Sequence, residues 1–132
     1  MKKLNVIIAL FLGLMWIGAY SQNNSDRCAI QNVKSGKNLR PYEAMNNDGN
    51  KIVLYDHVEW KCMTWEFIKD GENTFQLKNL FTSKTFQPSS DKVISGTGLV
   101  QQPLKKGDSK QLWEFIELTK GVYNIRLKGT EF

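Results

Sequence analysis

The sequence has few of the residues that catalytic and metal sites usually need. It contains one histidine and two cysteines in 132 residues. It has no Cys-x-x-Cys pair, no nucleophile elbow and no glycine-rich loop that could hold phosphate. Because His57 has no second histidine to share a metal, we expect neither a metal nor any other cofactor. A carboxylate pair such as Asp56 and Glu59 could act as acid and base, but nothing distinguishes it, and we expect no enzyme.

The sequence also lacks a concentrated basic segment. The formal net charge is +5, from 18 basic and 13 acidic side chains. Without Lys2 and Lys3, 16 basic and the same 13 acidic side chains remain, which gives +3. Apart from the pair Lys105-Lys106, the remaining lysines are scattered. A scattered charge is typical of a solvated surface, so we expect no nucleic-acid partner.

The first 21 residues are typical of a secretory signal peptide. Lys2 and Lys3 precede an apolar run over residues 4–19, and small residues then lead to a predicted cleavage between Ser21 and Gln22. An uncleaved anchor is the competing interpretation, but the run is short for a membrane span. No cysteine stands at the cleavage point for lipid attachment. We therefore expect a secreted protein, periplasmic or extracellular, with no membrane association after cleavage.

Both cysteines belong to the exported part of the chain. An oxidising compartment permits a disulfide between Cys28 and Cys62. If each begins its own antiparallel strand, however, the strands would hold the two residues apart. Spacing leaves a bridge and two buried thiols both open.

Beyond the signal peptide the pattern predicts strands and no helix. Apolar residues alternate with polar ones from Phe75 until Leu80 interrupts the pattern, and again over 123–127. Residues 52–55 form a short β-branched and aromatic run, with a counterpart at 99–100. Gly-, Asn- and Ser-rich turns separate these runs. Short strands at even intervals predict a closed all-β fold.

The chain repeats itself. The segment Trp65-Glu66-Phe67-Ile68 recurs unchanged at residues 113–116, a spacing of 48. A spacing of 47 relates Asn32, Lys37 and Pro41 to Asn79, Lys84 and Pro88, with Leu39 answered by Phe86. A unit of this length must pack against its own copies to bury an apolar core.

A third copy begins near the end of the sequence. Residues 123–126 echo residues 75–78, and we place Phe132 where Leu39 and Phe86 stand in the first two copies. We call the copies lobe one (28–70), lobe two (71–120) and the start of lobe three (121–132), within a domain of residues 22–132. Three lobes would need roughly 140 residues from Cys28 onward.

We therefore expect the third lobe to be incomplete in this sequence, or supplied in another way. The final residues Glu131 and Phe132 are what the codons GAA-TTC encode, a common cloning site, so an interrupted gene fragment is one hypothesis. An authentic stop codon after Phe132 would refute it.

On these residues the chain resembles the ricin-type β-trefoil lectin domain, whose three lobes carry a Gln-x-Trp signature. Lobe two has the signature as Gln111-Leu112-Trp113, whereas lobe one departs with Met63 in place of the glutamine. The turns at 35–39 and 82–86 also match the family. The resemblance implies a β-trefoil with pseudo-threefold repeats, in which Trp65, Gln111 and Trp113 form a structural core motif.

The resemblance also implies a shallow sugar pocket in each lobe. Such a pocket uses an Asp after the turn, an aromatic platform after the third strand, and an Asn before Gln-x-Trp. Lobe two has Gln87, Gln102 and Lys110 at these places, with no aromatic platform, and we expect it to be silent. Lobe one has Arg40, Tyr55 and Cys62 there, so we expect a degenerate pocket formed by Arg40, Asn50, Tyr55, Asp56 and His57.

Each of these residues has a plainer interpretation. Tyr55 is equally typical of a half-buried strand aromatic. His57, without a titrating partner, is more typical of a surface loop. Trp60 could be part of a binding face or a lid over the core. The run 46–50 superficially resembles a calcium loop but lacks the distal Glu, so we interpret it as a turn.

Together these observations predict a secreted carbohydrate-binding, lectin-like protein with at most one recognisable pocket. Two alternatives remain. The trefoil could serve protein recognition or inhibition, because a fold does not fix a function. It could also be a carbohydrate-binding accessory module of a secreted hydrolase. The sequence does not identify the sugar.

Overall fold

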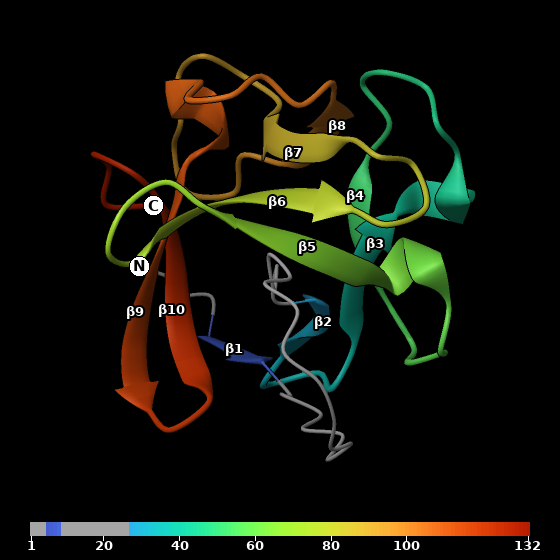
Figure 1. Cartoon of the computed structure of the whole chain (residues 1–132), viewed down its shortest axis with the longest axis horizontal. Coiled ribbons are helices and arrows are strands. Elements are labelled where there is room, and N and C mark those ends of the chain that lie inside the picture. The colour runs from blue at the N-terminus through green and yellow to red at the C-terminus, as the bar shows by residue number, and fades with distance from the viewer. Residues whose placement is uncertain (1–4, 9–26) are drawn as a thin grey trace, which may run out of the picture.

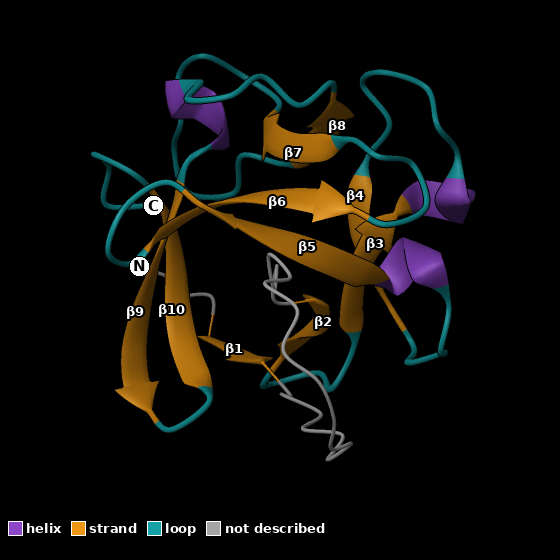
Figure 2. Cartoon of the chain, viewed as in Figure 1, coloured by secondary structure: helices purple, strands orange, loops and turns teal. Residues whose placement is uncertain are grey.

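The computed structural model describes residues 5–8 and 27–132. The expectation of an all-β fold is confirmed: these residues form ten strands and three short 3-10 helices (Figures 1 and 2). None of the described residues belongs to a helix long and apolar enough to cross a membrane. The strands are β1 (Asn5–Ile8), β2 (Arg27–Asn32), β3 (Asn38–Pro41), β4 (Ile52–Tyr55), β5 (Thr64–Lys69), β6 (Thr74–Asn79), β7 (Thr85–Pro88), β8 (Leu99–Gln102), β9 (Trp113–Thr119) and β10 (Val122–Leu127). The helices are η1 (Tyr42–Ala44), η2 (Lys61–Met63) and η3 (Ser109–Gln111).

Six antiparallel strands pair in a closed ring. The order is β1-β10-β9-β6-β5-β2, and β2 pairs back to β1. Two short hairpins, β3–β4 and β7–β8, stand beside the ring (Figure 1). Apart from η1, which lies between β3 and β4, the element order β2-β3-β4-η2-β5 recurs as β6-β7-β8-η3-β9, and β10 begins the pattern again.

Aromatic side chains from both lobes fill the interior. The rings of Trp65 and Trp113 each lie 5.1 Å from the ring of Phe86, and Phe67 lies 5.2 Å from Phe115. Trp65 is fully buried and Trp113 is 6 % exposed. The two matched indoles are thus packed inside one shared core, as the repeat predicts.

The turn after the first strand of each lobe is closed by the same backbone hydrogen bond. The bonds run from Asn32 N to Lys37 O at 2.8 Å, from Asn79 N to Lys84 O at 2.8 Å, and from Leu127 N to Phe132 O at 2.7 Å. A third lobe therefore does begin at β10. The register, however, corrects our placement of Phe132, which matches Lys37 and Lys84 in this bond and not Leu39 and Phe86.

Strand β1 lies within the segment that we expect to be a signal peptide. Its residues pair antiparallel with β10, as Val6 with Tyr123, and with β2, as Ile7 with Gln31. This strand completes the ring. The predicted cleavage between Ser21 and Gln22 lies outside the described residues and stays a prediction.

The two cysteines lie in different elements. Cys28 is buried in β2, opposite Trp65 of β5, and Cys62 is buried in η2. Cys62 is a thiol, so no bridge joins it to Cys28. The sequence left open a disulfide or two buried cysteine side chains, and the structure has the two buried side chains.

Phe86 is the side chain on which the shared core should depend most, because it contacts both tryptophans. We expect Phe86→Ala to lower the free energy of unfolding by about 3–5 kcal/mol, from lost transfer energy and a cavity. Phe81→Ala is the matched control, because Phe81 is 57 % exposed, and should change it by less than about 0.5 kcal/mol. Urea denaturation of both variants measures the difference; equal effects would contradict this account of the core.

Candidate functional site

The β3–β4 hairpin brings Arg40 and Tyr55 together. Arg40 is paired in register with Val53, which makes Tyr55, two residues on, its diagonal neighbour on the same face. The guanidinium carbon of Arg40 lies 3.7 Å from the centre of the Tyr55 ring, a cation–π contact. Two of the five predicted site residues are therefore in direct contact at the end of this hairpin.

Trp60 belongs to the same cluster, although we did not include it among the predicted site residues. It directly precedes η2, and its backbone holds it there: its N–H donates to Val58 O at 2.8 Å, and its carbonyl accepts from Met63 N at 2.9 Å. Its ring centre lies 5.9 Å from the Arg40 guanidinium carbon. Trp60 is 50 % exposed and Tyr55 is 42 % exposed. The exposure favours a binding face over a lid packed on the core.

Arg40 itself is almost buried, at 7 % exposure. Its Nε is buried and has no hydrogen-bond partner, and among the described residues no carboxylate lies within ion-pairing distance of the guanidinium. A buried charge normally has an opposite charge or several hydrogen bonds to compensate its desolvation. Among the described residues, Arg40 has instead the rings of Tyr55 and Trp60 beside its guanidinium group.

The two remaining loop residues, Asp56 and His57, directly follow Tyr55. The carboxylate of Asp56 lies 3.5 Å from Lys37 Nζ, in an exposed ion pair that contributes little to stability. The Nδ1 atom of His57 lies 2.7 Å from the side-chain nitrogen of Asn38. Because an amide nitrogen only donates, Nδ1 accepts, and the proton of the neutral ring is on Nε2. His57 is thus an exposed loop residue that the hairpin orients.

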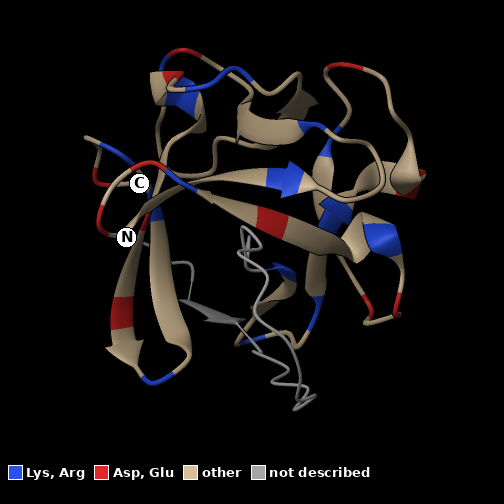
Figure 3. Ribbon diagram, in the orientation of Figure 1, with Lys and Arg blue, Asp and Glu red and all other residues tan. Residues whose placement is uncertain are grey.

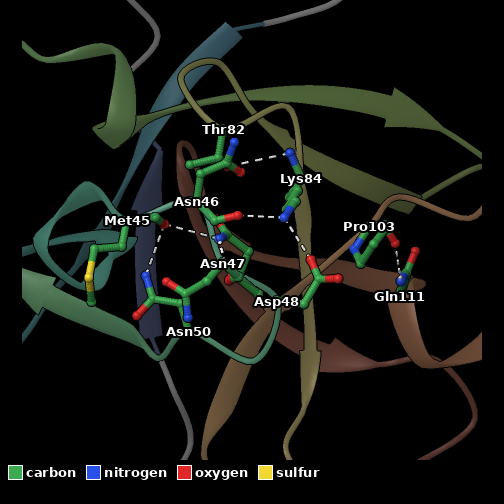
Figure 4. A network of polar contacts seen from close by, with 10 residues as sticks. Met45, Asn46, Asn47, Asp48, Asn50, Thr82, Lys84, Pro103 and Gln111 are labelled. Carbon is green, nitrogen blue, oxygen red and sulfur yellow. Dashed lines mark hydrogen bonds and ion pairs between the residues drawn. The ribbon is translucent and has the colours of Figure 1, made fainter.

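Asn50 does not join this cluster, which corrects our prediction. It is 6 % exposed, and its side-chain nitrogen donates to Tyr42 O at 3.0 Å and to Met45 O at 3.1 Å. Both amide hydrogens are therefore used inside its own loop, and Figure 4 shows the bond to Met45. Asn50 is a structural residue, and we leave it out of the proposed site.

The loop 46–50 is a contact between the lobes. Lys84 Nζ donates to Asn46 O and, at 2.6 Å, to Asp48 Oδ1, while Gln101 Nε2 donates to Asn47 O at 3.0 Å (Figure 4). The Lys84 ammonium group of lobe two therefore pairs with two oxygen atoms of the run that superficially resembled a calcium loop. The predicted turn is confirmed, and its backbone carbonyls and the Asp48 side chain hold two lobes together.

Lobe two ties up the equivalent residues internally. Gln111 is 1 % exposed; its Oε1 accepts from Lys105 N at 2.9 Å, and its Nε2 donates to Gln87 Oε1 and Pro103 O, both at 3.0 Å. Lys110 pairs with Asp91 and lowers the pKa of that carboxyl group, first by its hydrogen bond and then by its charge. The glutamine of the signature is therefore structural, and both Gln87 and Lys110 have partners within lobe two.

A separate groove lies between the loop after β7 and the strand β10. Its apolar lining includes Ile94, Leu99, Ile116, Ile125 and Phe132. Nothing in the sequence alone indicated it, because its two walls come from different lobes. It contains none of the predicted site residues.

Charged side chains are distributed over the whole ribbon. Figure 3 shows lysines and arginines on strands and loops alike, with acidic residues between them. Among the described residues, no group of three or more histidine, cysteine or acidic side chains could hold a metal ion. The lobe-one cluster of Arg40, Tyr55 and Trp60 is therefore the candidate site that the structure best defines.

Comparison with known structures supports the fold. No protein-family model and no curated protein matches the sequence. The designed threefold-symmetric protein ThreeFoil is similar in structure, with a TM-score of 0.72 and 20% identity over 77% of this chain and 72% of its own.

Two natural proteins show the same likeness over a smaller part of their own length. An exo-β-1,3-galactanase from Clostridium thermocellum has a TM-score of 0.61 and 22% identity over 70% of this chain and 20% of its own. A Polyporus squamosus lectin, solved with the glycan Neu5Acα2-6Galβ1-4GlcNAc, has a TM-score of 0.55 and 17% identity over 70% of this chain and 32% of its own. These likenesses show that the chain has a β-trefoil fold.

The glutamine signature of lobe two can be tested by exchanging it for the lobe-one residue. Gln111→Met should leave Gln87 Oε1 and Pro103 O without their donor. Unpaired buried polar groups cost about 1–3 kcal/mol, so the free energy of unfolding should fall by that amount. Met63→Leu in lobe one, which keeps an apolar side chain, should cost less than about 1.5 kcal/mol. Thermal unfolding distinguishes them; a neutral Gln111→Met would show that the signature is not structural.

Proposed function

We propose that this chain is a non-catalytic, ricin-type carbohydrate-binding protein whose sugar site is the lobe-one cluster of Arg40, Tyr55 and Trp60. The observation that carries the proposal is the pair of half-exposed aromatic rings around one guanidinium group. Tyr55 stands where the ricin-type resemblance expects the aromatic platform. Trp60 adds a second ring that the resemblance did not supply.

The chemistry of the cluster suits a sugar. The carbon–hydrogen face of a pyranose is apolar and stacks on an aromatic ring, while its hydroxyl groups need directed hydrogen bonds. Asp56 offers acceptors and His57 offers a donor at Nε2 directly beside Tyr55. Two of the similar structures also point this way, since one is a lectin bound to a glycan and the other is a galactanase.

Export is part of the proposal. The basic start, the apolar run and the small residues before Gln22 support removal of residues 1–21 and a secreted, periplasmic or extracellular location. We expect amino-terminal sequencing of the exported protein to begin at Gln22. A start at Met1 or Lys2 in the exported protein would contradict the cleavage.

The site itself can be tested on a glycan array with the full chain, followed by titration of the best glycan. Tyr55→Ala and Trp60→Ala should each raise Kd at least about tenfold, which corresponds to a loss of about 1.4 kcal/mol of binding. Phe81→Ala is the control, because it removes an equally exposed ring from a lobe-two turn.

The array also tests the alternatives. Failure to bind any glycan would reject the proposal in favour of protein recognition or inhibition by the trefoil. Binding restricted to the polymer substrate of a hydrolase would favour an accessory module. Glycan binding that survives both aromatic substitutions would place the site elsewhere.

A further inference from the structure

We infer that the lobe-one site binds an acidic saccharide, and that Arg40 receives its carboxylate or sulfate group. This inference rests on the proposed function and adds the class of sugar. It starts from a buried positive charge that nothing in the described part of the chain neutralises.

Arg40 is more than nine-tenths buried, and its polar atoms make no hydrogen bond or ion pair with any described residue. Nε is buried without a hydrogen bond. The two terminal nitrogens also make no hydrogen bond or ion pair to a described residue, yet they are not among the fully buried atoms. They therefore reach solvent. Nε of Arg40 is therefore shielded from water, whereas the terminal N–H groups remain available to a ligand.

The contacts with the two aromatic rings determine which atoms of the Arg40 guanidinium group can bind a ligand. The guanidinium carbon of Arg40 lies over the Tyr55 ring, 3.7 Å from its centre, and 5.9 Å from the centre of the Trp60 ring. Cation–π contact uses the face of a guanidinium plane and leaves the N–H bonds, which point outward in that plane, available. Parallel N–H bonds match the two oxygens of a carboxylate, or two of the oxygens of a sulfate, in bidentate geometry.

Comparison with lobe two shows why Arg40 of lobe one has no partner among the described residues. Gln87 occupies the position of Arg40, 47 residues later, and Gln111 Nε2 donates to its Oε1 at 3.0 Å. In lobe one the residue corresponding to Gln111 is Met63. Its sulfur already accepts from Val58 N at 3.4 Å and offers Arg40 no carboxyl or amide oxygen. Lobe one therefore has no amide oxygen at this position that could accept from Arg40.

The acidic residues nearby do not replace that partner. Asp56 is paired with Lys37 at 3.5 Å. Glu59, beside Trp60, is exposed and forms no ion pair with a described residue. Arg40 therefore keeps its charge for a ligand, while Glu59 would weaken binding of an anion and so limit the affinity.

The test uses the full chain and three trisaccharide probes of equal length: galactotriose, trigalacturonate and a monosulfated galactotriose. We expect at least one acidic probe to bind at least about tenfold more tightly than galactotriose at about 50 mM salt. The preference should decrease at about 300 mM salt, since screening weakens charge pairing. The tighter acidic probe identifies the group that Arg40 receives.

Two variants of Arg40 and one control complete the experiment. Arg40→Gln introduces the lobe-two residue, and the ratio of acidic to neutral affinity should fall to about one. Arg40→Lys keeps a positive charge but removes the paired N–H bonds, so the ratio should fall at least about threefold. Lys120→Gln removes one charge at the exposed β9–β10 turn and should leave the ratio unchanged. Circular dichroism checks that each variant folds; if Arg40→Gln does not, Arg40→Lys decides.

The outcomes separate the two proposals. If galactotriose or another neutral glycan binds through Tyr55 and Trp60 but neither acidic probe is preferred, the acidic class is wrong and the sugar site stands. A preference that survives both Arg40 variants, or that Lys120→Gln reduces equally, would assign it to diffuse charge and overturn the inference. If no glycan binds at all, the proposed function fails, and this inference fails with it.

Discussion

The structure depends on one repeated interaction, the hydrogen bond from a buried indole to a backbone carbonyl. Trp65 Nε1 donates to Leu39 O at 3.0 Å, and Trp113 Nε1 donates to Phe86 O at 3.4 Å. Each bond joins the last strand of a lobe to the short hairpin of the same lobe. Because Leu39 is tied to the core, the next residue, Arg40, must face the other side of the strand. The core therefore positions the candidate site as well as the barrel.

The sequence predicted those parts of the molecule that repeat. Matching tryptophans and turns at a fixed spacing require equivalent environments, so the closed all-β fold and the shared core followed from the pattern, and the resemblance to the ricin-type domain added the trefoil. The site was predictable only in part. Tyr55 has a defined place in a strand. Asn50 could form hydrogen bonds either to a sugar or within its own loop, and only the structure of the loop distinguishes these two roles. The repeat spacing is 47 residues in one part of the lobes and 48 in another. Sequence comparison therefore could not place Trp60 and Phe132, and the three-dimensional register was needed.

Closure of the ring could not be read from the sequence, because residues 5–8 look like part of an export signal. In the structure they form β1 and pair with both β10 and β2. By the threefold pattern this is where the last strand of a third lobe would stand, since β5 and β9 occupy that place in the other two. Cleavage after Ser21 would remove β1 and expose two strand edges, which proteins ordinarily cover. Residues 5–8 therefore close the ring in this structure, whereas the proposed cleavage would remove them with the signal peptide.

The two lobes differ most informatively at one coupled pair of positions. Lobe two holds Gln87 and Gln111 joined by an amide hydrogen bond, whereas lobe one holds Arg40 and Met63. A glutamine beside Arg40 would give the guanidinium an internal oxygen; a methionine gives it none. The methionine in lobe one therefore changes the surroundings of Arg40 as well as the repeat. Lobe one thus has a thioether in place of the structural amide and a cation that no described residue pairs with, beside two half-exposed aromatic rings. The bond from Trp65 to Leu39 O still holds the core of this lobe.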